Sequence, residues 1–303
     1  MYDVIIIGCG PAGMTAAIYA LRACKKVLIL EKETIGGLIT VTPLVENYPG
    51  FKQISGMDLG NNLYEQVISL GGQVKIEEVL TIKSGDLKTI VTEDNEYKTK
   101  TVIIATGSKP KALGIAEEER FIGNGISFCV SCDGPLYKNS DVAVVGGGNS
   151  AIITALSLAE ICHKVKIIQN LSYLTAEVSL INRLKRYNNI EIIYNNKVTE
   201  LFGDEDLNKI TIIDNNGNFK QLEISGMFVA VGQESQNKFL KDLITLDKDN
   251  YIISDNSCLT NQPGIFVAGD CRQKEVRQLT TAVSDGTVAA LSAINYINNK
   301  EQF

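Results

Sequence analysis

The amino-acid sequence predicts an α/β protein built from two Rossmann-like dinucleotide-binding domains, the second inserted into the first. A glycine-rich turn between an apolar strand and a helix occurs at residues 8–13 and again at 146–151. Residues 262–297 then return to a strand, a turn and a long helix. The 303 residues are enough for two domains of ordinary size.

The first domain opens with a complete dinucleotide-binding pattern at residues 2–33. The apolar run "VIII" predicts a buried parallel strand, and Gly8, Gly10 and Gly13 complete G-x-G-x-x-G before a helix. Gly8 permits the tight turn, Gly10 lets the backbone approach a pyrophosphate, and Gly13 lets the helix pack against the strand. The next strand, "KVLILE", ends in Glu31, which can accept hydrogen bonds from ribose hydroxyls. Together these features predict a bound adenine dinucleotide.

Residues 141–169 repeat this plan, with a difference at the end of the second strand. Gly146, Gly148 and Ala151 fit the variant G-x-G-x-x-A, which predicts a second unit of the same fold. NAD recognition requires an acidic residue at that strand end, and NADP recognition requires an arginine. This chain has Gln169 and Asn170 there, and a neutral amide gives a ribose no charge-assisted bond. The residues therefore predict the fold without predicting a bound pyridine nucleotide.

The closing segment returns to the first domain. Its strand leads into an "AGD" turn, a loop and a long helix from about Leu279. Asp270 follows the strand end, where it can meet the ribityl or pyrophosphate part of a flavin, and the helix start near Arg277 and Gln278 would point at the flavin ring. A further turn, "ATG", occupies residues 105–107. We predict a flavin-binding domain at residues 1–110 and 244–303, with an inserted domain at 111–243.

The bulk composition excludes several classes of protein. A net charge of −6 argues against general nucleic-acid binding. No apolar run approaches the length that spans a membrane, and the chain enters a strand at Tyr2, so we expect neither a membrane segment nor a signal peptide. The seven cysteines are scattered and odd in number, which is typical of a reducing compartment, so we expect a cytoplasmic protein.

The stretch "FCVSCDG", residues 128–134, contains a Cys-x-x-Cys pair with three possible interpretations. Zinc needs four ligands, but the other cysteines are isolated and His163 is the only histidine, so we expect no metal. A structural pair is disfavoured by Asp133 directly after it, which leaves a redox-active pair as the preferred interpretation. We expect Cys9, Cys24, Cys162 and Cys258 to be packing residues, whereas Cys271 follows Asp270 near the predicted flavin site.

The chain as a whole resembles the low-molecular-weight thioredoxin reductase family. The motifs that carry the resemblance are "GCGPAG", "VENYPG" with Gly36 and Gly37 before it, "ATG", "CVSCDGPLY", "VVGGGNSA" and "AGDC…RQ". The most specific is "CVSCDG" placed just before the second glycine turn. The resemblance implies the FAD/NAD(P)-binding disulfide reductase fold, FAD in the first domain, a homodimer, and a disulfide presented to the flavin from the inserted domain.

The resemblance also implies the residues of the flavin site and their roles. The flavin-binding residues would be Gly8, Gly10, Pro11, Ala12, Gly13, Glu31, Gly37, Leu38, Thr42, Asn47, Val79, Ala105, Thr106, Gly107, Gly269, Asp270, Arg277, Gln278 and Leu279. Cys132 would face the flavin, and Cys129 would attack the disulfide of the partner, thioredoxin. Because no histidine is near, Asp133 is the candidate acid that protonates the leaving thiolate.

The second glycine-turn domain departs from the family at the residues that bind the nucleotide. The family has a His and two Arg at the strand end, a third Arg beyond them, and two acidic residues in the preceding helix. In their places this chain has Gln169, Asn170, Leu171, Thr175, Ile153 and Thr154. Related NADH-using peroxiredoxin reductases share "GGGNS" but have a Glu where this chain has Gln169. The chain is therefore most similar to the ferredoxin-dependent flavin thioredoxin reductases of anaerobes, and ferredoxin is the expected electron donor.

Two alternatives remain open from the sequence. One is a thioredoxin or peroxiredoxin-system reductase that uses NADPH or NADH; the other is an FAD-dependent dithiol oxidase, although "CVSCDG" is closer to the reductases. An acidic ferredoxin would need a basic docking surface, for which the candidates are Arg183, Lys185, Arg186, Lys109 and Lys111. Such basic segments are more often ordinary solvated surface.

Overall fold

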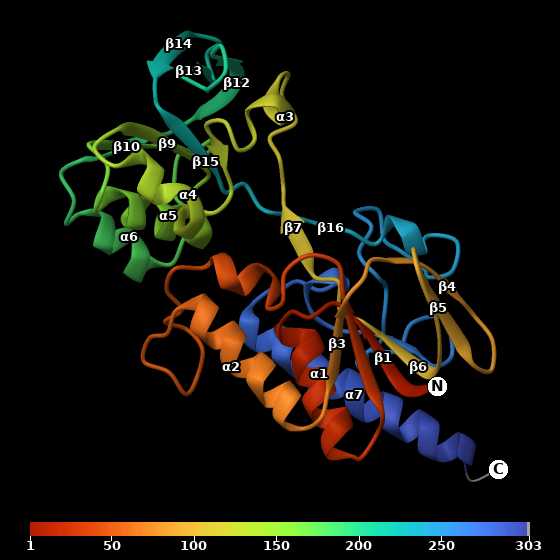
Figure 1. Cartoon of the computed structure of the whole chain (residues 1–303). Coiled ribbons are helices and arrows are strands. Elements are labelled where there is room, and N and C mark those ends of the chain that lie inside the picture. The colour runs from red at the N-terminus through yellow and green to blue at the C-terminus, as the bar shows by residue number, and fades with distance from the viewer. Residues whose placement is uncertain (302–303) are drawn as a thin grey trace. The chain divides into compact units, whose positions relative to one another are not determined.

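The computed structural model describes residues 1–301, and the chain divides into two compact units (Figure 1). Unit 1 is Met1–Lys109 together with the segment that begins at Glu234, and unit 2 is Pro110–Gln233. The second boundary differs from the one that the sequence indicates after residue 243. Asn237 explains the difference, since it is fully buried and its amide nitrogen donates to the carbonyls of Asn250 and Cys271 in unit 1.

Unit 1 contains a seven-stranded mixed sheet in the order β3-β2-β1-β6-β5-β4, with β17 also paired to β6. The strands are β1 (Tyr2–Ile7), β2 (Val27–Glu31), β3 (Gln73–Ile76), β4 (Val79–Lys83), β5 (Lys88–Thr92), β6 (Glu96–Ile104) and β17 (Ile265–Val267). The beginning of β6 pairs antiparallel with β5, whereas residues 102–104 pair parallel with β17. The sheet thus has a parallel part, β3-β2-β1-β6-β17, and an attached antiparallel hairpin, β4–β5.

Both faces of the parallel part are covered, which explains its nearly continuous apolar runs. Successive residues of β1 point to opposite faces: Val4 and Ile6 pack with the helices, whereas Ile5 and Ile7 pack with the β4–β5 hairpin and the segment around Leu240. The helices are α1 (Pro11–Arg22), α2 (Gly56–Ser69) and α7 (Leu279–Glu301). Short 3₁₀ segments are η1 (Gly37–Val41), η3 (Lys238–Leu240) and η4 (Gly269–Cys271).

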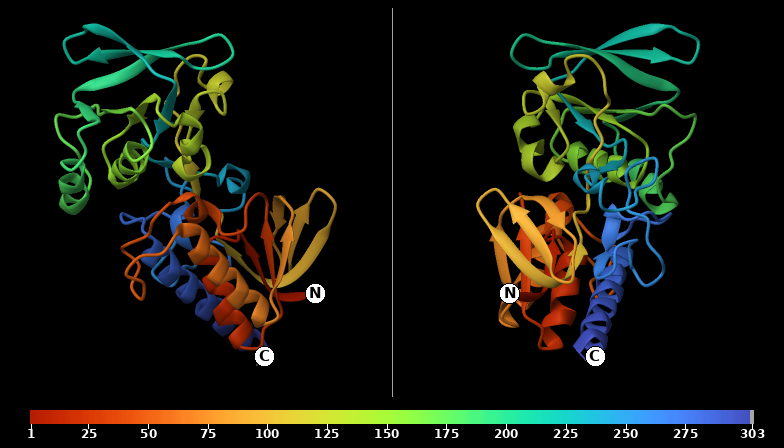
Figure 2. Two further views of the ribbon diagram at one scale, coloured as in Figure 1. Left: turned by 60° about the vertical axis from the view of Figure 1, so that its left-hand side comes forward. Right: turned by 90° about the vertical axis from the view of Figure 1, so that its right-hand side faces the viewer.

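Helices α1 and α7 lie side by side in both views of Figure 2. Their close approach depends on Gly286, because a Cβ atom there would come within 2.3 Å of the Ala12 carbonyl oxygen. Helix α1 begins with Pro11 at its first position, where the missing N–H has no intrahelical partner to lose. Helix α2 is capped by Ser55, whose hydroxyl accepts the N–H of Asp58 at 3.0 Å.

Unit 2 repeats the plan with a parallel five-stranded sheet in the order β11-β10-β9-β15-β8 and an antiparallel three-stranded sheet, β12-β13-β14. The strands are β8 (Ile126–Ser127), β9 (Asp141–Val145), β10 (Lys164–Ile168), β11 (Ile190–Ile193), β12 (Asn196–Phe202), β13 (Lys209–Asp214), β14 (Phe219–Glu223) and β15 (Gly226–Val229). The helices are α3 (Glu118–Phe121), α4 (Val130–Asp133), α5 (Asn149–Ala159) and α6 (Val178–Leu184), with η2 at Gly134–Tyr137.

Burial in unit 2 follows the same alternation as in unit 1. Val142 and Val144 of β9 pack with α5 and α6, whereas Ala143 and Val145 pack with the β12–β14 sheet.

The two segments that connect the units, β7 (Ser108–Pro110) and β16 (Gln233–Ser235), pair with each other. Within residues 1–301, no helix is long and apolar enough to cross a membrane.

Candidate active site

The first glycine turn has the geometry that the sequence pattern requires. Gly8 has a φ of +107°, and a Cβ atom there would come within 2.2 Å of the Ala105 carbonyl oxygen. A Cβ at Gly13 would come within 2.1 Å of the Gly8 carbonyl oxygen, so both positions must be glycine for α1 to approach β1. A Cβ at Gly10 would meet only the Gly36 carbonyl oxygen, at 3.9 Å. The turn therefore leaves open backbone beside the start of α1, as a pyrophosphate requires.

Glu31 at the end of β2 reaches back to this turn. One carboxylate oxygen accepts the N–H of Cys9 at 2.7 Å, and the other accepts the N–H of Glu33 at 2.9 Å. A carboxylate has further acceptor capacity after two such bonds, so Glu31 is held in place with lone pairs left for ribose hydroxyls. Burial, and then the Glu31 charge, raise the pKa of the Cys9 thiol to about 12, which makes Cys9 a packing residue.

The predicted flavin-site residues of the first domain converge on one edge of the sheet. Gly8, Glu31 and Ala105 each lie at or directly after the carboxyl end of a parallel strand, and Gly269 lies two residues after the end of β17. Thr106 and Gly107 follow Ala105, and the Thr106 hydroxyl donates to the Asn237 side chain at 2.9 Å. This edge is where ligands bind in open α/β sheets.

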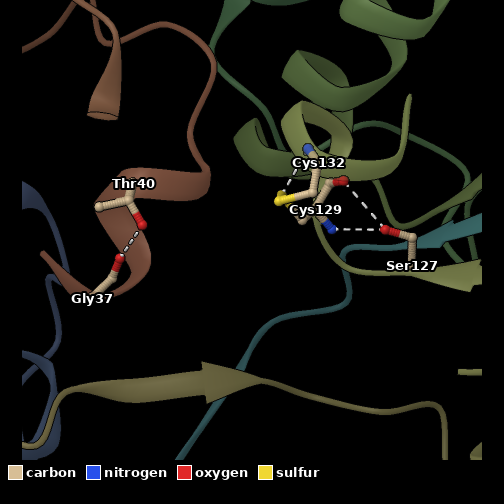
Figure 3. Close-up of a disulfide and its surroundings, with 5 residues drawn as sticks. All are labelled: Gly37, Thr40, Ser127, Cys129 and Cys132. Atoms are coloured by element: carbon tan, nitrogen blue, oxygen red, sulfur yellow. Dashed lines mark hydrogen bonds between the residues drawn. A yellow bond between two sulfur atoms is a disulfide. The ribbon is translucent and has the colours of Figure 1, made fainter. Parts of the chain in front are cut away.

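The remaining predicted residues come from loops of unit 1. Gly37 and Leu38 lie in η1, where the Thr40 hydroxyl donates to the Gly37 carbonyl at 2.9 Å (Figure 3). Thr42 directly follows η1, and the Asn47 amide donates to the Gln278 side chain at 3.5 Å, just before α7 starts at Leu279. Val79 starts β4, and the N–H of Glu77 donates to the Glu31 carbonyl at 2.8 Å, which brings that strand to the end of β2.

Asp270 supplies the best test of whether these residues fit a flavin. Its Oδ1 atom is buried and has no hydrogen-bond partner within the described residues, and Lys274 Nζ lies 3.7 Å away. Burial raises the pKa of this carboxyl above its ordinary value, with Lys274 and Arg277 opposing the shift. A buried acceptor without a hydrogen bond on the carboxyl edge is what the ribityl hydroxyls of a flavin would satisfy, so the residues fit the cofactor.

We expect Asp270→Asn to weaken FAD binding about ten- to hundredfold, because a charged acceptor is lost from the site. The apoprotein of the variant should melt at a higher temperature than wild type near pH 7. The folded apoprotein binds a proton at Asp270 more readily than the unfolded chain, so this carboxyl costs stability as the pH rises above its unfolded pKa. The check is FAD titration together with apoprotein melting at pH 4 and 7, with exposed Asp242→Asn as the control. Unchanged affinity would remove Asp270 from the site.

Asp285 of α7 holds the loop that carries Asp270, a role that the sequence reasoning missed. One carboxylate oxygen accepts from Arg272 Nη1 at 3.0 Å. The other accepts from Lys274 Nζ at 2.9 Å and from the N–H of Gly269 at 3.2 Å. The signal in the sequence was an Asp-Gly pair inside a helix, where neither residue is favoured without a tertiary reason.

Arg277 also serves this loop. Its guanidinium donates to the carbonyls of Asp270 and Arg272 and lies 3.9 Å from the centre of the Tyr251 ring.

Cys271 and Cys258 are both fully buried, and burial raises the pKa of each thiol, to about 11 for Cys258. Cys24 differs from the expectation of a packing residue: it is exposed, because it lies just beyond α1 with a φ of +56°.

The Cys-x-x-Cys pair forms a disulfide in unit 2 (Figure 3). Cys129 is the residue before α4, and its Sγ accepts the N–H of Cys132 at 3.1 Å. Cys132 is exposed, whereas Cys129 and Asp133 are half-buried. No group of three or more His, Cys, Asp or Glu side chains that could hold a metal occurs among residues 1–301. The arrangement is that of a disulfide with one exposed cysteine, followed directly in the sequence by Asp133.

The second glycine turn repeats the first in its backbone. Gly146 has a φ of +129°, and a Cβ atom there would come within 2.3 Å of the Ala230 carbonyl oxygen. Gly148 precedes α5 with an extended ψ of −178°, as Gly10 does before α1. Ala151 is fully buried where the first turn has Gly13. The backbone of a nucleotide-binding turn is therefore complete.

Gln169 occupies the position in unit 2 that Glu31 occupies in unit 1, but its side chain is used within the protein. It is 4% exposed, donates from Nε2 to the Tyr173 carbonyl at 3.0 Å, and accepts the N–H of Asn170 at Oε1 at 3.1 Å. A Cβ on Gly147 would come within 2.3 Å of the Gln169 amide, so this side chain lies against the turn itself. The amide holds a loop closed where a ribose would need an exposed acceptor.

The loop that follows lies across the turn. The N–H groups of Thr175 and Ala176 both donate to the Gly147 carbonyl, at 2.8 and 3.1 Å. Asn149, the first residue of α5, exchanges two hydrogen bonds of 2.8 Å with the backbone and side chain of Glu177. A carboxylate thus lies beside the start of α5, where a pyrophosphate would bring like charge. Leu171, Tyr173 and Val178 are exposed around this loop, and none is cationic.

The predicted basic residues are distributed over several elements. Lys109 pairs with Glu234 at 3.2 Å, and Lys185 donates to the Asn182 side chain at 3.0 Å. Arg183 lies in α6 and Arg186 follows it, exposed, as is Lys111. His163 is exposed and its Nδ1 lies 2.6 Å from an Asp141 carboxylate oxygen. These contacts describe ordinary surface and mark no single basic face.

Comparison with known proteins gives matches along nearly the whole chain. The family described as pyridine nucleotide-disulphide oxidoreductase matches residues 2–286. A 34.2 kDa protein in a rubredoxin operon of Clostridium pasteurianum is 44% identical over 303 residues, covering 98% of each chain. The thioredoxin reductase of Mycoplasma genitalium is 40% identical over 295 residues, covering 96% of this chain and 94% of that protein.

Two solved structures bear on the fold and on the electron donor. The thioredoxin reductase of Lactococcus lactis superposes with a TM-score of 0.96 at 38% identity, covering 99% of this chain and all of that one (100%). A ferredoxin-flavin thioredoxin reductase from Clostridium acetobutylicum gives a TM-score of 0.56 at 26% identity, covering 100% of this chain and 99% of that one.

Proposed function

Because the chain belongs to the thioredoxin reductases of the pyridine nucleotide-disulphide oxidoreductase family, we propose that it reduces thioredoxin with electrons from reduced ferredoxin. Its cofactor is FAD, as in the rest of the family. When bound, FAD supplies the two-electron chemistry that reduces a disulfide. The residues that would hold it are those on the carboxyl edge of the unit 1 sheet, above all the first glycine turn, Glu31 and Asp270.

The contacts of the disulfide support distinct roles for its two cysteines. A thiolate on Cys129 would receive a charge-assisted hydrogen bond from the N–H of Cys132, so Cys129 is the better leaving group. Reduction therefore starts at the Sγ of Cys132, the S–S bond breaks, and Cys129 leaves as the thiolate. We assign the proton donor to the dithiol to Asp133, the next residue in the sequence.

The same residues complete the transfer to thioredoxin. The Cys129 thiolate attacks the thioredoxin disulfide, which forms a mixed disulfide and releases one thioredoxin thiolate. Cys132 then attacks Cys129 Sγ, releases the second thioredoxin thiolate and restores the original disulfide. Two electrons and two protons have passed to thioredoxin, and two one-electron transfers from reduced ferredoxin replace the electrons.

The side chain of Gln169 is the observation that carries the proposal for the donor. Both of its polar atoms already bond backbone groups and the side chain is only 4% exposed, so it offers an adenosine ribose no charged or accessible acceptor. The strand end has no arginine for a 2′-phosphate, and Glu177 brings a negative charge to the start of α5. Two lost charge-assisted contacts weaken nucleotide binding by about a hundredfold or more. A donor that needs no nucleotide site avoids this loss.

The redox potentials make electron transfer from ferredoxin to thioredoxin favourable. Plant-type ferredoxins have potentials near about −400 mV and thioredoxin near about −270 mV. The difference of about 130 mV is worth roughly 6 kcal/mol for two electrons. The Clostridium acetobutylicum relative, by its description, combines this fold with ferredoxin.

We further propose that the protein acts as a homodimer in the cytoplasm.

A nucleotide-dependent thioredoxin reductase is the second candidate. The observation in its favour is the second glycine turn, whose backbone is complete from Gly146 to Ala151. Under this alternative, NADPH or NADH would bind across that turn and displace the loop held by Gln169.

The donor is decided by adding NADPH, NADH or reduced ferredoxin to the air-free flavoprotein and following the visible flavin absorbance. We expect ferredoxin to reduce the flavin and either nucleotide to be at least about a hundredfold slower. Subsequent reduction of thioredoxin should require ferredoxin, and Cys129→Ser should still accept electrons from ferredoxin without passing them on. Rapid bleaching by a nucleotide would overturn the ferredoxin proposal. Bleaching by a free dithiol with fast reoxidation in air would identify a dithiol oxidase instead.

A further inference from the structure

Ser127, the last residue of β8, holds both backbone groups of Cys129 with one hydroxyl (Figure 3). Its Oγ accepts the N–H of Cys129 at 3.0 Å and donates to the Cys129 carbonyl at 3.3 Å. Ser127 is 4% exposed, so water does not compete for these bonds. The N–H of Asp133 also donates to the Cys129 carbonyl, at 3.1 Å. The backbone of Cys129 is thus fixed from two sides.

This fixed backbone determines where the Cys129 sulfur lies. With φ of −131° and ψ of 99°, Cys129 presents its Sγ to the N–H of Cys132 at 3.1 Å. Within residues 1–301, the structure shows no corresponding donor to the Cys132 sulfur. The bond to Cys129 strengthens when its sulfur becomes a thiolate, because an ionised acceptor binds a donor more strongly. The asymmetry between the two sulfurs therefore depends on the orientation of Cys129.

We propose that Ser127 is a positioning residue for the disulfide exchange, which stabilises the Cys129 thiolate by keeping its sulfur on the N–H of Cys132. The inference rests on the proposed redox role of the pair, but not on the identity of the electron donor. By this positioning, Ser127 makes the reduced state of the cysteine pair more favourable, since stabilising the thiolate of a dithiol shifts the pair toward reduction. It also makes Cys129 reactive at lower pH than an ordinary thiol.

A purely structural role for Ser127 makes a different prediction. In that case, removing the hydroxyl leaves a buried N–H unsatisfied and lowers the stability of the fold, without a change in the chemistry of the thiols. The two roles are therefore separated by measurements on the dithiol itself. Thermal melting of the oxidised protein reports only the structural contribution.

The test compares Ser127→Ala and Ser127→Thr with wild type, all as full-length flavoprotein. Ser157→Ala is the matched control, because that hydroxyl also donates to a backbone carbonyl of unit 2, Ile153, at 3.0 Å, but does not contact Cys129. The first measurement is the equilibrium of protein disulfide plus two glutathione with protein dithiol plus glutathione disulfide. The dithiol fraction is counted by mass spectrometry after acid quenching and alkylation. The second is the pH profile of alkylation of the reduced protein at Cys129 by iodoacetamide.

We expect Ser127→Ala to lower the equilibrium constant toward dithiol about three- to tenfold, where tenfold corresponds to about 30 mV. The midpoint of the Cys129 alkylation profile should rise by about half to one pH unit. Ser127→Thr, which keeps the hydroxyl, and Ser157→Ala should both match wild type in these two measurements.

Equal values in Ser127→Ala and wild type, with or without a lower melting temperature, would refute the positioning role. That result decides the matter even if Ser127→Thr does not fold. If the wild-type pair does not exchange with glutathione at all, the redox role of the disulfide fails as well, so the two failures are distinguishable.

Discussion

Cys129→Ser should end thioredoxin reduction, with a loss of at least about a thousandfold, while FAD remains bound at the wild-type ratio. The loss is large because the nucleophile of a covalent mechanism cannot be replaced by a hydroxyl of much higher pKa. The proposed flavin site consists of unit 1 residues, whereas Cys129 lies in unit 2, so FAD content should not change. The measurement is thioredoxin-dependent turnover with ferredoxin as donor. Cys24→Ser, at an exposed cysteine outside the disulfide, is the control and should retain full activity.

The comparison of Cys129→Ser with Cys132→Ser assigns the two roles. The probe is a thioredoxin with one active-site cysteine, activated as an aryl disulfide, so that attack by a thiolate releases the coloured aryl thiol. Cys132→Ser retains the stabilised Cys129 sulfur and should form a lasting mixed disulfide at least about tenfold faster than Cys129→Ser. Faster reaction by Cys129→Ser would reverse the assigned order. Retained turnover in either variant would exclude the disulfide from the reaction.

Gly8→Ala should produce protein without FAD and destabilise unit 1 by more than about 3 kcal/mol. The new Cβ would lie 2.2 Å from the Ala105 carbonyl oxygen, and a φ of +107° disfavours any L side chain. Because the obstructing atom belongs to the backbone at the end of β6, the turn and the strand must separate. The flavin-to-protein absorbance ratio and thermal melting provide the measurement.

Gly71→Ala separates backbone strain from collision in this experiment. Gly71 has a φ of +82° in the same unit, but a Cβ there meets no atom within 4 Å. We expect it to destabilise the protein by about 1–2 kcal/mol and to retain its flavin. If Gly8→Ala also binds FAD at the wild-type ratio, the first glycine turn does not hold the cofactor.

The asymmetry between the two glycine turns has a consequence for how such folds change function. Both turns keep the backbone that brings a helix close to a strand, since the packing of each unit requires it. The residue at the following strand end is under no such requirement. The Glu31 carboxylate accepts the N–H of Cys9 in the turn, whereas Gln169 directs its amide to its own loop. Under the proposed function, a nucleotide site would be lost through a few side-chain changes that leave the fold intact.

The local patterns of the sequence were sufficient to predict the two α/β units and the pairing of Cys129 with Cys132. Glycine spacing, alternating burial and cysteine spacing act over a few residues, so a pattern can be recognised without knowing the partners. The sequence indicated a boundary near residue 244, whereas the structure groups residues 234–243 with unit 1, where Asn237 donates to the carbonyls of residues 250 and 271. Cys24 was predicted incorrectly as a packing residue, because its exposure depends on how α1 ends.

Taken by itself, the sequence determined the class of fold and the carboxyl edge of the sheet on which a dinucleotide would lie. It also determined that position 169 has a glutamine, and neither an arginine nor an acidic residue. Only the tertiary structure decided that the Gln169 amide is occupied, that Asp285 anchors the loop of Asp270, and that Ser127 orients Cys129. The physical reason is that a hydrogen bond depends on distances and directions between groups that are set only when the chain has folded. Residue type states what a side chain can do, and the surrounding backbone decides which of those bonds it makes.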